Sequence, residues 1–421
     1  MIKHYKIQYG PQTITLDIDS SRVSFILQPG EMPIVETRQE LYRALAVPIG
    51  AKPLRDIVKT GDRVVIMGDD ATRLTPTKEI IPIILDELNA GGVPDKDLEL
   101  IIATGTHRAM TEEELEDKYG SGVTNRIKVT NHDCLNTDNL VPCGTTSRGT
   151  DIWINKTVME ADVAIGVGNI LPHHPTGWSG GAKILLPGVA GEHSVGQMHL
   201  LGATEQQLGK IDTPCREEME DFAHETGLDF IVNTVLDREG NVVRIVAGHF
   251  IEAHREGIQW GQKVFGVPFK EKTDITLSSS FPCDHDLFQA TKGLFSTVHC
   301  TKQGGEVILI SPCTEGVSPT HPETVELAKL SDHELLALAA DPESGHDVLS
   351  ITAALYLNSS KRAVNVTLVT EGIPKETVEK LGFRHLRPSD LAEYLTFRLA
   401  EDPNATLGIV HNSAEVVPLQ E

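Results

Sequence analysis

Two histidines, a glycine-rich turn and a lysine stand together between His173 and Lys183. They follow an apolar run, residues 161–167, which predicts a buried strand. Ligands of open α/β sheets bind at the carboxyl ends of strands. Three glycines let the backbone approach a bound group closely: Gly177, Gly180 and Gly181. The composition of this loop therefore predicts a site for chemistry.

Residue types alone leave several interpretations of this loop open. His173 or His174 could ligate a metal ion, and Lys183 could anchor a cofactor covalently. The loop is not a Walker A motif, because Ile184 stands where that motif needs serine or threonine. His199 lies in a predicted helix, where a histidine taken by itself has a structural role.

A second polar segment, residues 68–77, connects a predicted strand to a predicted helix. A helix N-terminus attracts anions, and Arg73 could clamp a carboxylate or phosphate there with two hydrogen bonds. The alternative is ordinary capping of the helix by Thr75 or Thr77, with Arg73 in a surface ion pair. The pattern does not decide between the two.

Two other segments present polar side chains next to predicted strands. His107 follows predicted strand 98–103 and suits a general base, because the pKa of a histidine lies near neutrality. The alternative is a hydrogen-bonded loop histidine. Gln289 and Lys292 share one face of a predicted helix, where they could reach a carboxylate of a ligand or face solvent.

The rest of the chain alternates between predicted strands and helices. Apolar and polar residues alternate over the first thirty positions around Tyr9-Gly10-Pro11, which predicts a small β element with a turn. From about residue 37 the alternation is typical of βαβ units and a parallel sheet. Predicted strands are 63–67, 98–103, 127–129, 152–154, 161–167, 275–278, 306–310, 364–369 and 407–410, and predicted helices are near 38–45, 78–90, 193–225, 286–301, 322–340 and 389–400, with a capping box at 111–114.

Chain length and one interruption of the pattern predict two domains. Single cores stop growing at roughly 250–300 residues, and the chain has 421. Glycine, proline and charge interrupt the pattern at residues 265–272. We predict an α/β fold of two domains with parallel-rich sheets: residues 1–268, which carry the histidines and Lys183, and residues 269–421, which close an active-site cleft between the domains.

Composition narrows the class of partner. A net charge of −23 opposes a surface for nucleic acid or anionic membrane. The six cysteines contain no Cys-x-x-Cys pair, so they predict neither a disulfide framework nor a thiolate zinc site and favour a reducing cytoplasm. No apolar stretch of about 18 residues occurs, and the N-terminus lacks a signal-like apolar segment. We expect a cytoplasmic protein whose partner is a small molecule, without nucleic acid or membrane.

Five motifs together make the chain resemble the nickel-pincer lactate racemase family. They stand in the family's order: Asp70–Arg73, Gly105–His107, Pro172–Lys183, His199 and Gln289–Lys292. The resemblance spans residues 70–292 and implies a nickel-pincer nucleotide, a pyridinium bisthiocarboxylate mononucleotide that holds nickel through one carbon and two sulfurs. It also implies two classes of partner, a 2-hydroxy acid substrate and the enzymes that make the cofactor.

The resemblance also implies a role for each matched residue. Lys183 matches the covalent cofactor anchor, His199 the protein ligand of nickel, and His107 with His173 the paired acid/base groups. The remaining matches divide into cofactor-binding residues (Asp70, Thr72, Gly180 and Gly181) and residues around the substrate (Arg73, Phe288, Gln289 and Lys292).

The implied reaction inverts C2 of a 2-hydroxy acid. Proton removal would leave an unstable carbanion beside an ionised carboxylate, whereas hydride removal gives a planar 2-keto acid. Each enantiomer then needs its own base for the hydroxyl proton, which explains a pair of histidines. Nickel held by soft sulfur and one imidazole would be square planar.

The chain departs from the lactate-specific pattern. Phe288 stands where lactate-racemising relatives tend to have tyrosine, and Leu74 replaces a common proline. All three tryptophans precede the second predicted domain, so a tryptophan near the substrate is missing there. We therefore expect a substrate larger than lactate, such as a sugar acid, malate or an aliphatic or aromatic homologue.

Three alternatives stay open at this point. One is a lactate racemase proper. Another is a zinc-dependent hydrolase built on His107, His173 and a carboxylate, which predicts activity with zinc alone. The third is a non-catalytic protein that binds a nucleotide or hydroxy acid, which predicts ligand binding that survives His107→Ala and His173→Ala.

Overall fold

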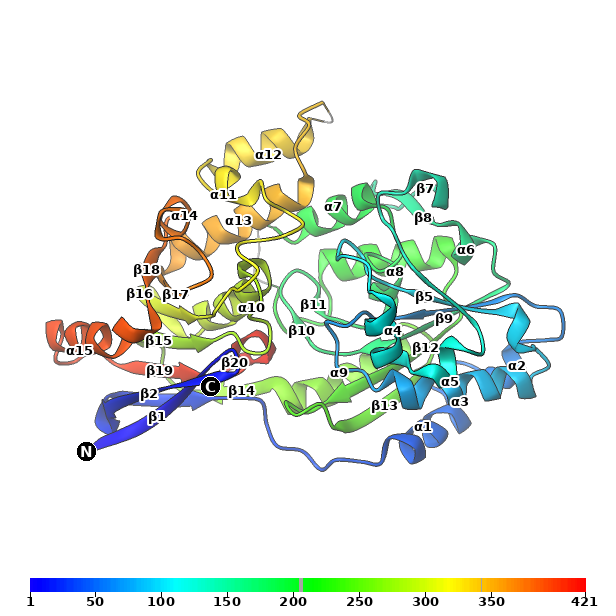
Figure 1. Cartoon of the computed structure of the whole chain (residues 1–421), viewed down its shortest axis with the longest axis horizontal. Coiled ribbons are helices and arrows are strands. Elements are labelled where there is room, and N and C mark those ends of the chain that lie inside the picture. The colour runs from blue at the N-terminus through cyan, green and yellow to red at the C-terminus, as the bar shows by residue number, and fades with distance from the viewer. Residues whose placement is uncertain (204–206, 342) are drawn as a thin grey trace.

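The computed structural model describes residues 1–203, 207–341 and 343–421 and contains two six-stranded sheets (Figure 1). The first sheet has the strand order β13-β12-β9-β4-β5-β6, and only β12 and β13 run antiparallel. Its strands are β4 (Val64–Gly68), β5 (Leu98–Ile102), β6 (Lys128–Asn131), β9 (Val163–Asn169), β12 (Phe230–Leu236) and β13 (Val242–Gly248).

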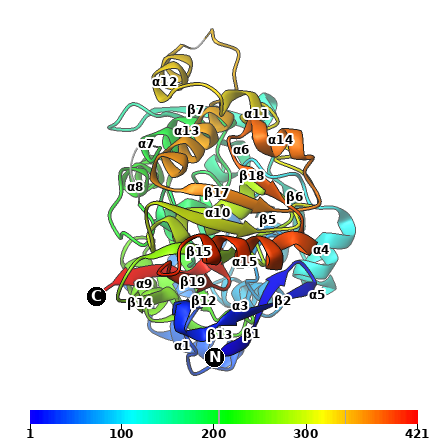
Figure 2. The ribbon, with the colours of Figure 1, turned by 90° about the vertical axis from the view of Figure 1, so that its left-hand side faces the viewer.

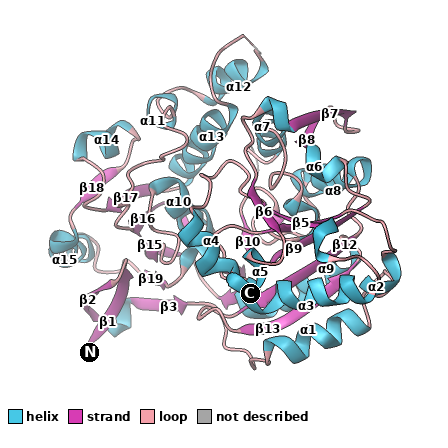
Figure 3. Ribbon diagram, turned by 45° about the vertical axis from the view of Figure 1, so that its right-hand side comes forward, coloured by secondary structure: helices cyan, strands magenta, loops and turns pink. Residues whose placement is uncertain are grey.

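The second sheet is parallel throughout, in the order β18-β17-β16-β15-β19-β3. Its strands are β3 (Val23–Leu27), β15 (Thr273–Ser279), β16 (Thr301–Ile310), β17 (Asn365–Val369), β18 (Arg384–Leu386) and β19 (Leu407–Val410). The predicted α/β class with two parallel-rich sheets is confirmed. Figure 3 shows both sheets in magenta with helices in cyan around them.

The predicted domain division at residues 268 and 269 stays a prediction. Strand β3 pairs with β19, so the start of the chain joins the second sheet before the chain enters the first. Within residues 265–272, where we expected a boundary, β14 (Gly266–Phe269) pairs in parallel with β20 (Val417–Gln420). The glycine and proline of this segment therefore lie in a short strand.

Helices cover both faces of the first sheet because its strands alternate their buried side chains. Val64 and Ile66 of β4 face α1 (Thr37–Ala46) and α3 (Thr77–Ala90) in one apolar cluster. Val65 and Met67 face the opposite cluster, to which α7 (Glu192–Leu201), α8 (Pro214–Thr226) and α9 (Glu252–Phe265) contribute. A strand that is buried on both faces is typical of a parallel sheet.

The second sheet is also covered on both faces. Val307 and Leu309 pack with α10 (Leu287–Val298), α12 (Asp332–Ala340) and α13 (Val348–Ala363). Ile308 and Ile310 pack instead with α15 (Leu391–Glu401) and with the hairpin of β1 (Ile2–Tyr9) and β2 (Gln12–Asp19). Figure 2 shows α15 and this hairpin in front of the second sheet. The predicted N-terminal β element and its turn are thereby confirmed.

Two predicted helices are each divided in two. Segment 193–225 forms α7 and α8, because Thr213 caps a new helix that starts with Pro214. Segment 322–340 forms α11 (Thr324–Leu327) and α12, because Ser331 and Glu334 make a capping box. The predicted capping box at Thr111 opens α4 (Glu112–Tyr119), as expected.

The smaller elements are α2 (Leu54–Ile57), α5 (Ser121–Thr124), α6 (Lys156–Met159), α14 (Lys375–Lys380), β7 (Leu140–Thr145), β8 (Asp151–Asn155), β10 (Pro172–His173) and β11 (Gly177–Trp178).

None of the helices in the described ranges combines the length and apolar character that crossing a bilayer requires.

Candidate active site

The polar motifs meet in a pocket at the carboxyl ends of three neighbouring strands. Asp70 follows β4, His107 follows β5 and His173 follows β9, and these strands are adjacent in the order β9-β4-β5. Residues of α10 and α13 line the same pocket from the side of the second sheet. The pocket holds about 1410 Å³ of empty space, counted with the open solvent at its mouth.

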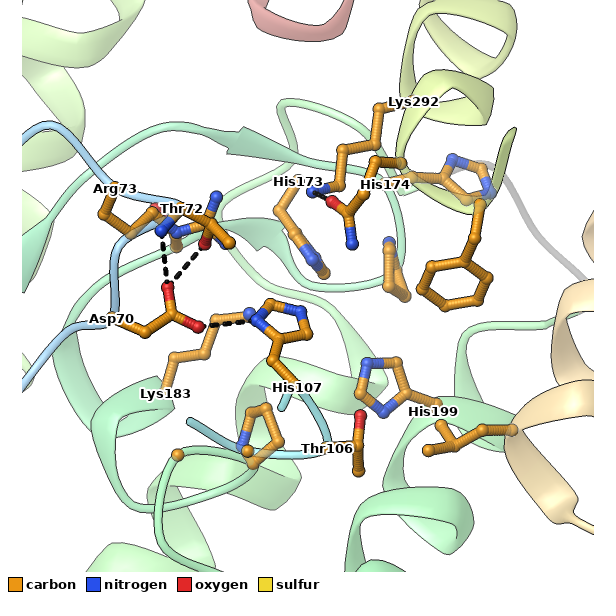
Figure 4. Close-up of a pocket in the computed structure, with 18 of the residues that line it drawn as sticks. Asp70, Thr72, Arg73, Thr106, His107, His173, His174, Lys183, His199 and Lys292 are labelled. Atoms are coloured by element: carbon orange, nitrogen blue, oxygen red, sulfur yellow. Dashed lines mark hydrogen bonds and ion pairs between the residues drawn. The ribbon is translucent and has the colours of Figure 1, made fainter. Parts of the chain in front are cut away.

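Asp70 orients His107 (Figure 4). His107 Nδ1 lies 2.7 Å from Asp70 Oδ2, and Asp70 Oδ1 accepts from the backbone N–H and the hydroxyl of Thr72. Burial alone would raise the pKa of Asp70, but the hydrogen bond and charge of His107 and the charge of Arg73 hold it well below its usual range. An ionised Asp70 needs a donor, so His107 carries its proton on Nδ1 and presents Nε2 to the pocket.

His173 is held in the same tautomer by another partner. Thr176 donates its hydroxyl hydrogen to Trp178 O at 2.9 Å, so its oxygen accepts from His173 Nδ1, also at 2.9 Å. Burial places the pKa of His173 well below 6.5, and the positive charge of Arg73 acts in the same direction. His173 is therefore a neutral imidazole with Nε2 free to take a proton.

Lys183 enters the pocket as a neutral amine. Burial lowers its pKa far below 10.5, and the positive charges of Arg73, Lys292 and Arg216 act in the same direction. A neutral amine is the nucleophilic form of lysine. This side chain follows Gly180 and Gly181, whose φ angles of +79° and +60° favour glycine.

A network of buried side chains holds the backbone that precedes Lys183. Arg216 of α8 is fully buried and donates to Trp178 O and to Gly180 O. His254 of α9 is also fully buried, with Nε2 2.8 Å from Ser179 O. The N–H of Gly181 donates to Asn233 Oδ1 at 2.8 Å. Charged and neutral donors thus bind three successive carbonyls of this segment, those of Trp178, Ser179 and Gly180.

We expect Arg216→Met to lower the free energy of unfolding by about 2–4 kcal/mol, because two buried carbonyls lose a charged donor. Methionine keeps most of the volume, so the cavity contribution is small. The matched control is Arg63→Met, which removes an exposed partner of Glu160 and Asp162 and costs at most about 1 kcal/mol. Urea unfolding measures both. Equal losses for the two variants would contradict the role of Arg216.

His199 presents an imidazole suited to a metal. Its Nδ1 donates to Val195 O one helical turn earlier, at 2.8 Å, which leaves the lone pair of Nε2 free. Burial lowers the pKa of His199 to about 4, so the ring is neutral at neutral pH. His199 lines the pocket (Figure 4). This position is compatible with the ligand role that the resemblance implies.

The pocket side of α10 carries Phe288, Gln289 and Lys292. Asp286 caps this helix, and Lys292 Nζ donates to Gln289 Oε1. Burial lowers the pKa of Lys292. The interpretation of Gln289 and Lys292 as a solvated helix face is therefore wrong.

For residues 68–77, the interpretation as ordinary helix capping by Thr75 or Thr77, with Arg73 in a surface ion pair, is also wrong. Helix α3 begins after Pro76 without a side-chain cap. Thr75 instead donates its hydroxyl to Asp69, and Thr77 donates to Lys118 O. Arg73 forms no surface ion pair within the described ranges, and its charge acts on the pKa of Asp70 and of Lys183. Arg73 lines the pocket as a free cation.

The pocket brings together nearly all predicted site residues: Asp70, Thr72, Arg73, His107, His173, Gly180, Lys183, His199, Phe288, Gln289 and Lys292. Gly181 does not line the pocket. The sequence analysis missed several lining residues, among them Thr104, Asn169, Asn233, Phe295, Leu349, Ala353 and Tyr356. The position of Thr104 and Asn169 at strand ends could have indicated these two.

In the part of the chain that is described, no three His, Cys, Asp or Glu side chains are grouped so that they could hold a metal ion. A zinc hydrolase built on His107, His173 and a carboxylate therefore lacks its ligand set. A metal that brings its other ligands with it, and needs one imidazole from the protein, remains compatible with His199.

These features define an α/β protein with a pocket that brings together cationic side chains, two histidines with free Nε2 atoms and a lysine. Residues 9–209 match the family model described as the lactate racemase N-terminal domain. The chain is 30% identical over 320 residues to the lactate racemase of Thermoanaerobacterium thermosaccharolyticum, across 74% of this chain and 75% of that protein. It is 30% identical over 319 residues to the lactate racemase of Lactiplantibacillus plantarum, with the same coverage. The chain belongs to the lactate racemase family.

Solved structures agree with this assignment. The lactate racemase apoprotein of T. thermosaccharolyticum superimposes with a TM-score of 0.88 at 25% identity, covering 99% of this chain and 100% of that chain. A Thermotoga maritima protein matches with a TM-score of 0.72 at 19% identity, over 93% of this chain and 100% of that chain, and shares the fold.

Proposed function

We propose that this protein is a racemase or epimerase that inverts C2 of a 2-hydroxy acid with the help of a nickel-pincer nucleotide joined to Lys183. The supporting observation is the set of groups around one pocket: the neutral amine of Lys183, the free Nε2 of His199 and the free Nε2 atoms of His107 and His173. Family membership supports the nickel-pincer group in general terms.

The residues fit that group. A neutral Lys183 suits a covalent bond to a carboxyl-derived carbon, and His199 Nε2 suits a metal that is already held by carbon and sulfur. When bound, the group takes the C2 hydrogen together with its electron pair and gives it back. Family resemblance adds Asp70, Thr72, Gly180 and Gly181 to the cofactor site.

The side chains of the chain itself do the remaining work. Arg73 and Lys292 hold the substrate carboxylate, with Gln289 beside them, and so fix the reacting carbon in place. His107 and His173 each accept the hydroxyl proton of one enantiomer at Nε2 and return it to the other. Asp70 keeps His107 in the tautomer that does so, as Thr176 does for His173.

The substrate in this proposal is larger than lactate, because Phe288 lacks the phenol hydroxyl and no tryptophan of the second half lines the pocket. The proposed partners are this hydroxy acid and the cofactor-synthesis enzymes, and the proposed compartment is the cytoplasm. Chiral chromatography of a 2-hydroxy acid panel, treated with protein co-produced with those enzymes, tests the function. Inversion of at least one acid supports it, whereas binding without inversion of any acid favours the non-catalytic alternative.

We expect His199→Ala to lose nickel without losing the covalent modification of Lys183. The variant removes the imidazole ligand, so metal affinity falls by at least about 10- to 100-fold, while the amine stays in place. The control is His193→Ala, an exposed histidine on the same helix. Elemental analysis and intact-mass spectrometry measure the two properties separately. Unchanged nickel in His199→Ala would contradict the assignment.

A further inference from the structure

One side of the pocket is an apolar wall. It is formed by two helices and the loop that follows β16, and its members are Leu287, Phe288 and Phe295 of α10, Val317 of the loop, and Leu349, Ala353, Tyr356 and Leu357 of α13. Helix α13 packs against α7, the helix that carries His199. The wall therefore borders the part of the pocket where we place the reaction.

Three hydroxyl groups of this side donate within the protein, whereas that of Ser318, next to Val317, accepts from the backbone N–H of His321. Tyr356 donates its hydroxyl to His199 O at 3.0 Å, which leaves the ring as its pocket surface. Thr291 donates to Phe288 O at 2.7 Å, and Thr324 donates to His321 O at 2.9 Å. These three hydroxyl hydrogens are thus not available to a polar ligand.

The aromatic rings beside the wall are neutral. His174 stacks on Phe295 with ring centroids 4.2 Å apart and meets Tyr356 edge-on at 4.9 Å. Burial and the nearby His299 lower the pKa of His174 to about 3. The ring of His174 therefore adds to the aromatic cluster and brings no positive charge to it.

The α13 side of the wall carries no lysine or arginine. Among the described lining residues the lysines and arginines are Arg73, Lys183 and Lys292; Lys292 is on α10, and none of the three is on α13. A second carboxylate against α13 would lose its water without gaining a cation there, and sugar hydroxyls against the Leu349, Ala353 and Leu357 side chains would lose theirs without gaining partners. Both losses disfavour malate and sugar acids.

We infer that the substituent on C2 of the substrate is a branched aliphatic or aromatic group that packs on the wall of α10 and α13. This inference rests on the proposed racemase function and narrows its substrate class. Ala353 gives the substituent its room, because its methyl group lies one helical turn from both Leu349 and Leu357 on the same helix face.

Calorimetric titration of the cofactor-loaded protein with racemic acids tests the inference. A racemate is already at equilibrium, so the heat reports binding without net conversion. We expect 2-hydroxy-4-methylpentanoate and 3-phenyllactate to bind at least about tenfold more tightly than lactate, because the added carbons leave water. Malate and glycerate should bind no more tightly than lactate. Tightest binding of malate, glycerate or lactate would overturn the inference.

A substitution at Ala353 tests whether the preference for larger acids arises at this wall. Ala353→Trp fills the space, so we expect the affinity for 2-hydroxy-4-methylpentanoate to fall at least about tenfold while that for lactate stays within about threefold. The control is Ala337→Trp, at an exposed alanine of α12, which should leave both affinities unchanged. Retained preference for the larger acid in folded Ala353→Trp would overturn the inference. Should this variant not fold, the wild-type titrations still decide.

The chiral assay separates the two possible failures. Inversion of malate or lactate in preference to the larger acids leaves the racemase proposal intact and refutes the apolar substituent. Binding of the larger acids without inversion of any acid refutes the racemase proposal and leaves the binding preference standing.

Discussion

Lys183→Arg is expected to lower the rate of stereochemical inversion below detection. The buried amine is neutral because burial and the charges of Arg73, Lys292 and Arg216 lower its pKa. A guanidinium stays protonated in that environment and cannot form the covalent bond. Without the bound group the protein has no acceptor for hydride, and enzymes generally accelerate their reactions by at least about 10⁶-fold.

Intact-mass spectrometry and chiral chromatography of protein co-produced with the cofactor-synthesis enzymes measure this expectation. Wild-type protein should carry added mass on Lys183, and Lys183→Arg should have its bare mass. Lys210→Arg, at an exposed lysine, is the control and should keep both the added mass and the activity. Full activity of Lys183→Arg would contradict the proposal that Lys183 anchors the cofactor covalently.

His107→Ala and His173→Ala are each expected to lower kcat/KM by about 10²- to 10⁴-fold. The two enantiomers of a simple hydroxy acid are equally stable, so the loss must be the same from either one. Inversion needs both bases in turn. The double variant should therefore be about as slow as the slower single variant, as is usual for groups that act as a unit.

Initial rates from each pure enantiomer test this expectation, with His333→Ala, an exposed histidine of α12, as the control. If the fold-losses in kcat/KM of the two single variants multiply in the double variant, the two histidines act independently. That result would contradict the paired-base arrangement.

The location of the site could be predicted because parallel strands end at the same edge. Asp70, His107 and His173 are far apart in the chain, yet each follows a strand, and the three strands are neighbours. Their chemistry depends on partners that the spacing does not reveal. The Asp70–His107 hydrogen bond joins residues 37 positions apart, and the threonine that orients His173 also binds a carbonyl.

Other features of the structure could not be predicted from the sequence, for physical reasons. Helix α13 is buried on most sides, so its sequence has no helical periodicity to detect. Arg216 stands in an acidic stretch that is typical of an exposed helix, although its side chain is fully buried. Thr75 and Thr77 have the types of capping residues, but their hydroxyls bind Asp69 and Lys118 O. Such tertiary contacts override local preference.

The central claim is that the C2 hydrogen moves as hydride and never mixes with water. A 2-hydroxy acid that the loaded enzyme inverts, labelled with deuterium at C2 and turned over in ordinary water, tests this claim. Mass spectrometry of the inverted enantiomer should find deuterium retained at C2. Replacement of that deuterium by solvent hydrogen at the rate of inversion would show proton abstraction and contradict the account.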